Sequence, residues 1–163
     1  MIIKNLGKNF IINLSLVVLI FLFDRISKIY VIYLDKKFLG SEMFSSKFLN
    51  IILIWNEGIA FGLFSFDKKY LYNILTLFIV IIIIVIFFIL IKSKGFKKYS
   101  LLMILGGALG NVYDRIFFKA VPDFIDFHIN NFHWFIFNVA DIFITLGVFF
   151  MILYELKETK KVK

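Results

Sequence analysis

The polar side chains best suited to catalysis lie in one stretch, residues 106–141, of an otherwise apolar chain. Around this stretch run long segments of Ile, Leu, Phe and Val, and the chain is 61% hydrophobic. A charged group in or near hydrocarbon is costly, so each charged residue there is a candidate for function. Besides Asn111, Arg115 and Asn138, the stretch contains the aspartates Asp114, Asp123, Asp126 and Asp141.

Paired carboxylates are the chemistry that these aspartates suggest. Two carboxyl groups held together near an apolar wall do not both ionise easily, so they share a proton. One can then act as base and the other as acid on a bound water, which is the chemistry of an aspartic protease. The polar stretch therefore predicts an aspartic-type protease site set in a membrane.

The positions of the cations separate structural aspartates from reactive ones. Asp24, in the first apolar run, has Lys28 four residues later on the same helix face. Asp114 adjoins Arg115 and has Asn111 one turn before it. A nearby cation favours the ionised carboxylate, so we expect Asp24 and Asp114 to be charged and structural.

Asp141 differs because no cation lies within one helical turn of it. Its polar neighbours are Asn138, three residues before, and Thr145, four residues after. Asp123 and Asp126 lie in a connection whose only near cation is a lysine. We predict that Asp141 is one member of the carboxylate pair. The spacing leaves open whether Asp123 or Asp126 is the other.

The two histidines give only a weak indication of a metal site. His128 and His133 are the only histidines, and the chain has no cysteine, which excludes thiolate ligands, disulfides and a thiol nucleophile. Both could be metal ligands, but they lie among aromatic residues, and an interfacial position is the simpler interpretation. We expect no metal and no cofactor. The net charge of +8 favours an anionic membrane leaflet over nucleic acid as its partner, and no nucleic-acid motif is present.

Membrane-spanning helices are predicted to carry most of these residues. A mean hydropathy of +0.93 over 163 residues is too apolar for a soluble domain of this length. We predict a mainly α membrane protein with a single domain over residues 1–163. A bilayer is spanned by about 20 apolar residues. The predicted spans are residues 11–34, 70–91, 99–118 and 138–156.

The segment of residues 36–66, between the first two predicted helices, has a different character. Residues 48–55 are short and β-branched, which predicts a strand. Asn56 and Gly58 follow, with the glycine at a position typical of a turn or bulge. Unpaired backbone groups are costly in hydrocarbon, so we expect a small sheet on the membrane surface. Residues 119–137 form a second connection on the same side.

The lysines orient the chain. Short basic segments lie at the N-terminus, at residues 92–98 and at residues 157–163, all on one predicted side. The positive-inside rule therefore places both termini in the cytoplasm. Asp24, Asp114 and Asp141 each lie 16 residues from a lysine at the basic end of their helix, which is roughly 24 Å of helix. The shared depth predicts one polar site in the outer third of the bilayer, facing outward.

Other classes of function remain open from the residues alone. Intramembrane Asp, Arg and Asn are equally natural in a small transporter. Such proteins usually have internal repeats, and the sequence shows none. A non-enzymatic assembly subunit would pair its charges with partner helices and spread them over several helix faces. Gly106 and Gly110 form a GxxxG pattern, which lets helices approach closely and is purely structural.

Five blocks of the chain match, in order, the motifs of one known family. Residues 24–28, DRISK, resemble DQxxK, and residues 56–62, NEGIAFG, resemble NxGAAFG. Residues 106–115, GGALGNVYDR, resemble GGAxGNxxDR. Residues 121–124, VPDF, resemble VxDF, and residues 137–141, FNVAD, resemble FNxAD. The chain thus resembles the lipoprotein signal peptidases (signal peptidase II), which are bacterial membrane aspartic proteases.

The resemblance implies a membrane aspartic endopeptidase that removes the signal peptide from diacylglyceryl-modified prolipoproteins, cutting before the lipidated cysteine. It implies four transmembrane helices with an extracytoplasmic β-cradle in the inner membrane, and a prolipoprotein substrate. We expect a functional monomer, with substrate and membrane lipid as its partners. The family's catalytic aspartates fall on Asp123 and Asp141, which decides the choice left open above. Asp24 and Lys28 match a pair kept for structure or for positioning the lipid substrate. The residues that match substrate-binding or supporting positions are Asn56, Gly58, Asn111, Asp114, Arg115 and Asn138.

The chain departs from the family pattern at a few positions. Arg25 replaces Gln, Ile59 replaces Ala, Lys119 stands where Gly is common, and Pro122 is unusual before Asp123. These departures leave the catalytic assignment intact. They concern the conformation of the loop before Asp123 and the fine preference for substrates.

Overall fold

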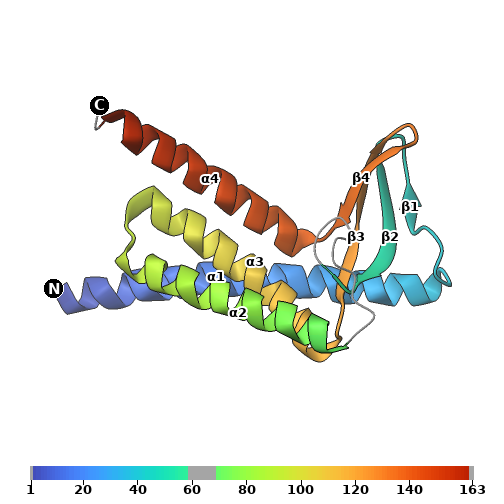
Figure 1. Cartoon of the computed structure of the whole chain (residues 1–163), viewed down its shortest axis with the longest axis horizontal. Helices are drawn as coiled ribbons and strands as arrows, with labels where there is room; N and C mark the ends of the chain where they lie inside the picture. The colour runs from blue at the N-terminus through green and yellow to red at the C-terminus, as the bar shows by residue number, and fades with distance from the viewer. Residues whose placement is uncertain (1, 59–68, 162–163) are drawn as a thin grey trace.

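Helices and one small sheet make up the part of the chain that the computed structural model describes, residues 2–58 and 69–161. The sheet stands at the end of the helices that lies away from both termini (Figure 1). Each predicted helix coincides with one of those in the structure, and the first extends further at both ends. The helices are α1 (Ile2–Lys37), α2 (Lys69–Lys92), α3 (Gly95–Phe117) and α4 (Val139–Lys161).

Helix α3 is the centre of the helical part, because it contacts α1, α2 and α4. A Cβ on Gly107 would lie 2.5 Å from the carbonyl oxygen of Ala140 on α4, and one on Gly106 would lie 2.9 Å from an isoleucine of α1. Gly110, the second glycine of the GxxxG pattern, faces the Asp24 carboxylate in the same way. Close approach of this kind needs small residues. The packing role expected of Gly106 and Gly110 is therefore confirmed.

Three of the helices, α1, α2 and α4, are long and apolar enough to cross a membrane. Only 22%, 11% and 17% of their most apolar windows is buried within the protein, so most of these side chains face outward. Within the described residues, α3 is not among these candidates. It carries Asn111, Asp114 and Arg115, and the other helices pack around it. Outward-facing apolar helices of this length are typical of a protein embedded in a bilayer.

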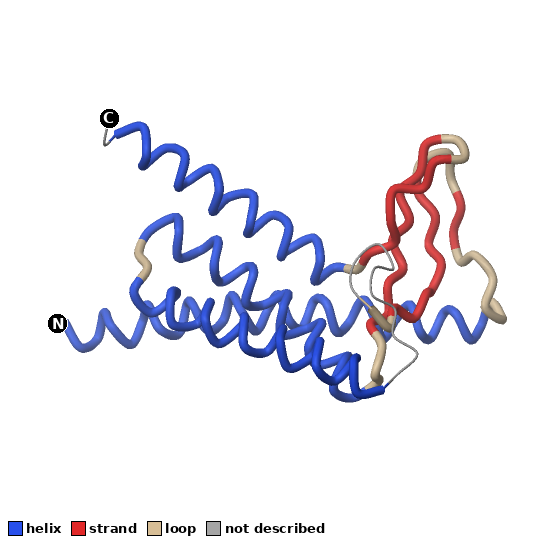
Figure 2. Tube along the Cα trace, viewed as in Figure 1, coloured by secondary structure: helices blue, strands red, loops and turns tan. Residues whose placement is uncertain are grey.

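The sheet is antiparallel throughout, in the order β1-β2-β3-β4. Its strands gather at one end of the helices (red in Figure 2). Strand β2 confirms the strand predicted at residues 48–55. The part of the predicted 36–66 segment that falls on residues 59–66 lies outside the described residues. The strands are β1 (Phe44–Ser45), β2 (Leu49–Asn56), β3 (Val121–Ile129) and β4 (Phe132–Phe137).

Strands β3 and β4 are a difference from the sequence prediction, which treated residues 119–137 as a plain connection. The available signal was a pair of β-branched and aromatic runs on either side of Asn130-Asn131, which is typical of a hairpin. Asn130 has a φ of 54°, in the left-handed region that such tight turns use. The charges and histidines within the runs obscured the alternation.

The entry to β3 contains two of the departures from the family pattern. Lys119 has a φ of 61°, a left-handed conformation that favours glycine. Pro122 pairs with Trp55 of β2, whereas the pairing with β4 begins only at Ile125. At Pro122 the strand therefore has a neighbour on one side, a position where a missing N–H is tolerated.

Candidate functional site

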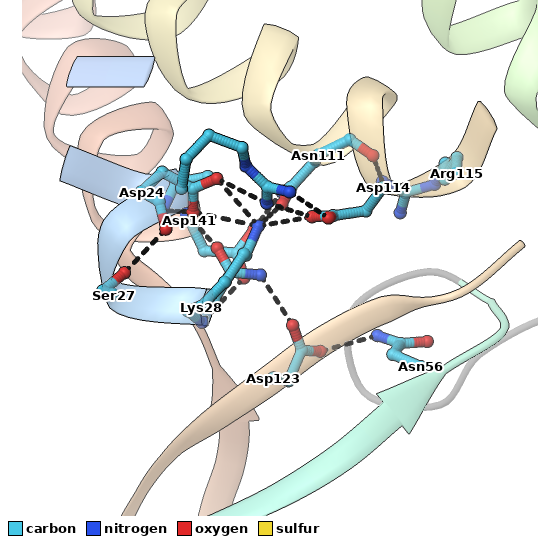
Figure 3. A network of polar contacts seen from close by, with 12 residues as sticks. Asp24, Ser27, Lys28, Asn56, Asn111, Asp114, Arg115, Asp123 and Asp141 are labelled. Atoms are coloured by element: carbon cyan, nitrogen blue, oxygen red, sulfur yellow. Dashed lines mark hydrogen bonds and ion pairs between the residues drawn. The ribbon is translucent and has the colours of Figure 1, made fainter. Parts of the chain in front are cut away.

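One part of the polar site is a charge quartet, formed by Asp24, Arg25 and Lys28 of α1 and Asp114 of α3. The Arg25 guanidinium donates to both carboxylate oxygens of Asp114, at 2.6 and 2.7 Å, and to Asp24 at 3.0 Å. Lys28 Nζ lies 2.9 Å from Asp24 Oδ1 and 2.7 Å from Asp114 Oδ2 (Figure 3). Two positive and two negative charges therefore neutralise one another.

Burial makes the charge quartet a fixed structural unit. Asp24 and Asp114 are 0% exposed, and Lys28 is 1% exposed. The backbone N–H of Ala140 on α4 also donates to Asp24, at 3.1 Å. Removing one partner of a buried ion pair leaves an uncompensated charge, which costs about 3–5 kcal/mol. The quartet thus holds α1, α3 and α4 in one arrangement.

Lys28 links the charge quartet to Asp141 through the side chain of Asn111. Besides its two carboxylate partners, the Lys28 ammonium donates to Asn111 Oδ1 at 2.9 Å. Because the amide oxygen of Asn111 faces this cation, its Nδ2 points the other way and donates to Asp141 Oδ1 at 2.8 Å. The group that donates directly to Asp141 here is therefore a neutral amide, which a cation of α1 holds in place.

Asn138 and Asp141 form a reciprocal cap at the start of α4. Asn138 immediately precedes the first helical residue, and its side-chain oxygen accepts the N–H of Asp141 at 3.1 Å. The Asp141 carboxylate accepts the N–H of Asn138, also at 3.1 Å. This is the geometry of a capping box. It holds the Asp141 side chain at the helix N-terminus, where the helix dipole favours a negative group.

Asp123 reaches the same cap from the sheet. Its two oxygens accept Nδ2 of Asn138 at 2.6 Å and Nδ2 of Asn56 at 2.9 Å. Asn56 pairs with Val121, which places it diagonally across from Asp123. Burial and, second, the Asp141 carboxylate raise the pKa of Asp123 to about 6, against the hydrogen bonds from Asn56 and Asn138. We call Asp123 and Asp141 the amide-held pair, because their hydrogen-bond donors are neutral amides.

Arg115 donates hydrogen bonds to backbone carbonyl groups next to this pair. Its guanidinium donates to the carbonyl oxygens of Asn111 at 3.1 Å and Gly58 at 3.3 Å. The N–H of Gly58 in turn donates to Asn56 Oδ1 at 2.8 Å. Arg115 therefore ties the end of β2 to α3 and helps to fix the amide that faces Asp123.

Asp126 lies apart from the amide-held pair. Its carboxylate contacts Nδ1 of His133 at 2.8 and 3.0 Å and accepts Nδ2 of Asn50 at 3.4 Å. Of the two aspartates that spacing alone did not separate, Asp123 is the one that shares a hydrogen-bond partner with Asp141. That partner is Asn138.

An apolar cavity of about 340 Å³ adjoins Asp141, between the sheet and α4. Phe127, Trp134 and Phe137 line it from the sheet, and Leu146 lines it from α4. Ligand sites commonly combine such apolar walls with a few polar groups. The Asp141 carboxylate thus borders a space suited to an apolar group.

The structure brings the predicted site residues together, but the partners of Asp114 differ from those expected, and Arg25 joins the site. The expectation that a cation neutralises Asp114 is confirmed, but the cations are Arg25 and Lys28 of α1 rather than Arg115. Sequence reasoning missed Arg25, which appeared only as a replacement for Gln. A further intramembrane cation near the predicted depth of Asp114 was the available signal. The predicted residues that join this arrangement are Asp24, Lys28, Asn56, Gly58, Asn111, Asp114, Arg115, Asp123, Asn138 and Asp141.

Both the sequence and the fold are similar to those of known proteins. The family model for signal peptidase (SPase) II matches residues 16–157. A lipoprotein signal peptidase of Pelagibacter ubique is 52% identical over 149 residues, covering 91% of this chain and 90% of that protein. One of Anaplasma phagocytophilum is 39% identical, covering 91% and 94%. A solved bacterial membrane enzyme structure aligns with a TM-score of 0.72 at 30% identity, over 93% of this chain and 91% of that one.

Proposed function

The chain belongs to the signal peptidase II family, and from this premise we propose that it removes the signal peptide from diacylglyceryl-modified prolipoproteins. Membership of the family makes the chain a protease and an integral membrane protein, with the function of a lipoprotein signal peptidase. The cut falls before the lipidated cysteine, as the matching motif blocks imply.

The catalytic groups in this proposal are the amide-held pair, Asp123 and Asp141. One observation carries the assignment: both carboxylates meet at Asn138 and accept hydrogen bonds from neutral amides. The cations Arg25 and Lys28 are bound instead within the charge quartet. Neighbouring carboxylates without a bound cation do not both ionise easily, so the pair shares a proton. A pKa of about 6 for Asp123 supports a shared proton near neutral pH.

A shared proton suits general acid–base hydrolysis of a peptide bond. The ionised carboxylate takes a proton from water as the water oxygen bonds to the scissile carbonyl carbon, and the protonated carboxyl donates to the carbonyl oxygen. The tetrahedral intermediate then collapses, the C–N bond breaks, and the amine leaves with a proton from the pair. The products are a signal peptide with a new carboxylate and a lipidated cysteine with a free amino group. Each transferred proton comes from the pair or from water.

The surrounding residues hold the pair and the substrate. Asn111 and Asn138 orient Asp141, while Arg115 and Gly58 support Asn56 beside Asp123. Amide and guanidinium groups in these positions can also donate to the backbone of an extended substrate. The apolar cavity beside Asp141 fits an acyl chain or an apolar side chain of the substrate. The charge quartet, with Asp24, Lys28 and Asp114, keeps α1 and α3 in register under them.

We place the site at the outer face of the inner membrane. In this topology α3 is a fourth transmembrane helix, covered by the three apolar ones, and the lysines keep both termini in the cytoplasm. The sheet then forms an extracytoplasmic cradle; its position at the end of the helices away from both termini supports this (Figure 1). The chain acts as one domain and as a monomer, with lipidated substrate and membrane lipid as its partners.

A cleavage assay in detergent micelles tests the proposal. The purified protein is given a diacylglyceryl-modified prolipoprotein and, separately, its unlipidated precursor. We expect cleavage of the lipidated form alone, and no cleavage by Asp123→Asn or Asp141→Asn. Glu42→Gln makes the same chemical change at an exposed residue outside the network, and should cleave like wild type.

The outcomes separate the activity from the assignment of residues. Turnover at close to the wild-type rate by either aspartate variant would overturn the proposed pair. A folded wild-type protein that cleaves neither substrate would overturn the proposed activity itself.

A further inference from the structure

A second cluster of ionisable side chains lies in the β3–β4 hairpin, apart from the amide-held pair. Asp126 and His128 of β3 and His133 of β4 each offer one ligand atom, and these atoms lie within 4.8 Å of one another. His128 pairs directly with His133 across the strands, and their rings stack with centroids 5.0 Å apart. Strand pairing therefore gathers three side chains of metal-binding types at one point.

One atom of the cluster is a buried nitrogen that needs a partner. Nδ1 of His128 is buried, and no hydrogen-bond partner for it is found among the described residues. A buried polar atom without a partner costs free energy. In native structures such an atom needs an explanation, and a bound ion or water is one that fits a cluster of ligand-type side chains. Neutral imidazole nitrogen is also the commonest protein ligand for metals. The nitrogen of His128 thus points to a ligand at this position.

The other two side chains are already oriented toward the same point. Asp126 is 4% exposed and accepts Nδ2 of Asn50 at 3.4 Å, while Ser45 Oγ donates to Asn50 Oδ1 at 2.9 Å. Outer contacts of this kind orient carboxylate ligands in metal sites. Nδ1 of His133 faces both oxygens of Asp126, at 2.8 and 3.0 Å. The cluster therefore has both candidate ligands and supporting contacts behind one of them.

We propose that Asp126, His128 and His133 bind one zinc ion in the hairpin, separate from the proteolytic site. Two imidazole nitrogens and one carboxylate oxygen form a donor set that Zn²⁺ accepts in tetrahedral geometry, with water as the fourth ligand. Ligands at about 2.0 Å from zinc lie roughly 3.3 Å apart. The exposed ring of His133 can rotate to close the remaining gap. The ion joins β3 to β4 near their turn and stiffens the strand that carries Asp123.

An ion pair between His133 and Asp126 alone is the competing explanation. It uses two of the three residues but provides nothing for Nδ1 of His128, and it predicts no affinity for zinc. The composition of the chain makes the distinction clear. With only two histidines and no cysteine in the sequence, a histidine-ligated metal signal comes from this cluster.

Zinc titration of the full-length protein, purified in detergent with any tag removed, tests the proposal. A chromophoric chelator competes for the metal, and we expect one Zn²⁺ per chain. Co²⁺ serves as a second probe, because tetrahedral coordination by nitrogen and oxygen gives it a visible absorption band. Zinc should also raise the Tm of the wild-type protein.

Variants locate the bound metal. His128→Ala and His133→Ala should each weaken zinc binding more than tenfold and abolish the Co²⁺ band. Asn50→Ala removes only the contact behind Asp126, so a loss of about tenfold is expected. Glu42→Gln, a change at an exposed acid outside the cluster, should bind zinc like wild type. If either alanine variant does not fold, the corresponding glutamine variant replaces it.

Two results would overturn the zinc site. One is a folded wild-type protein with no measurable zinc binding, as the ion-pair explanation predicts. The other is equal zinc affinity in wild type and in either histidine variant, because the metal then lies elsewhere on the chain. Zinc binding is measured directly, so neither result depends on whether the chain cleaves prolipoproteins.

Discussion

The aspartates of the polar site fall into two pairs with opposite surroundings. Asp24 and Asp114 are fully buried and bonded to cations in the charge quartet. Asp123 and Asp141 lie next to them but accept hydrogen bonds from neutral amides. The same side-chain type therefore has two roles in one network, and the partners decide which role each carboxylate has.

Cations and amides act differently on a carboxylate. A cation favours the charged form, and in a buried pair it makes that form part of the fold. An amide orients the carboxylate oxygen but leaves the group able to exchange a proton, so burial can raise the pKa of Asp123 to about 6. Asn111 is the link between the pairs, since it accepts from Lys28 and donates to Asp141. The cations thus give the quartet a structural role, whereas the neutral donors leave the amide-held pair able to exchange a proton, as the proposed catalysis requires.

The largest expected effect is the loss of cleavage when the amide-held pair is changed. Asp123→Asn removes one member of the acid–base pair, and we expect the cleavage rate to fall by at least about 10²–10⁴-fold. Because no buried cation loses its partner, the Tm should stay close to that of wild type. Rates on lipidated prolipoprotein and thermal unfolding are measured in the same detergent. A large fall in Tm would contradict the different roles of the two pairs, because Asp123 would then be structural as well.

The opposite pattern is expected for the charge quartet. Asp114→Asn leaves Arg25 and Lys28 with one carboxylate between them, and we expect a loss of about 3–5 kcal/mol in the free energy of unfolding. The double variant Arg25→Gln/Asp114→Asn removes both charges of the bidentate pair. It should therefore be more stable than Asp114→Asn alone, which unfolding in mixed micelles can measure. Additive losses in this cycle would show that the two residues are not coupled.

A smaller effect is expected at Asn138, which serves both the cap and Asp123. Asn138→Ser keeps a side-chain oxygen for the cap but loses the amide that donates to Asp123, so activity should fall about tenfold while stability changes little. Asn138→Ala loses the cap as well, so the free energy of unfolding should fall by a further amount of about 1 kcal/mol. Cleavage rates and Tm values of both variants test the separation. Equal stability of the two variants would contradict the role of the cap.

The smallest expected effect is a shift in pH dependence. Burial raises the pKa of Asp123 from 3.8 to about 6, so the native protein favours the protonated group. The contribution of protonated Asp123 to the stability of the fold is therefore fully present below the ordinary pKa of 3.8, and it is lost as the pH rises through about 6. If the pair needs one proton, cleavage should decline over the same range of rising pH, and the profile reports the pair as a whole.

Asn56→Ala sharpens this prediction. It removes a hydrogen bond that opposes the raised pKa of Asp123, so the declining limb of the pH–rate profile should move to higher pH. The matched control is Asn50→Ala, an asparagine on the same strand that contacts Asp126 instead. In Asn50→Ala the declining limb of the pH–rate profile should lie at the same pH as in wild type. A limb that moves to lower pH in Asn56→Ala would contradict the assignment.

Much of the fold is predictable because its signals are local. Long apolar runs between charged segments indicated the four helices, and β-branched residues indicated β2. Strands β3 and β4 were missed because Asp123, Asp126 and His128 interrupt an otherwise apolar alternation. In the structure Asp123 and Asp126 have hydrogen-bond partners on the neighbouring strands and at Asn138, just before α4. The sequence of one strand does not indicate such partners.

The candidate site was predictable in its members more than in its pairings. The contact of Asp24 with Lys28 follows from helical spacing and is confirmed. The contact of Arg25 with Asp114 joins residues 89 positions apart, so no local pattern indicates it. It depends on the approach of α1 to α3 at Gly110, where a side chain would meet Asp24.

The membrane class, the positions of the helices, the family and the set of polar residues follow from the sequence alone, because composition, periodicity and motif spacing are properties of contiguous residues. The tertiary structure was needed to show which acids contact cations and which contact amides, and that Asp123 rather than Asp126 shares a hydrogen-bond partner with Asp141. It also decided that Asp126 lies with both histidines. Helix packing and strand register set these contacts, and both bring together residues whose separation along the chain carries no information about their distance in space.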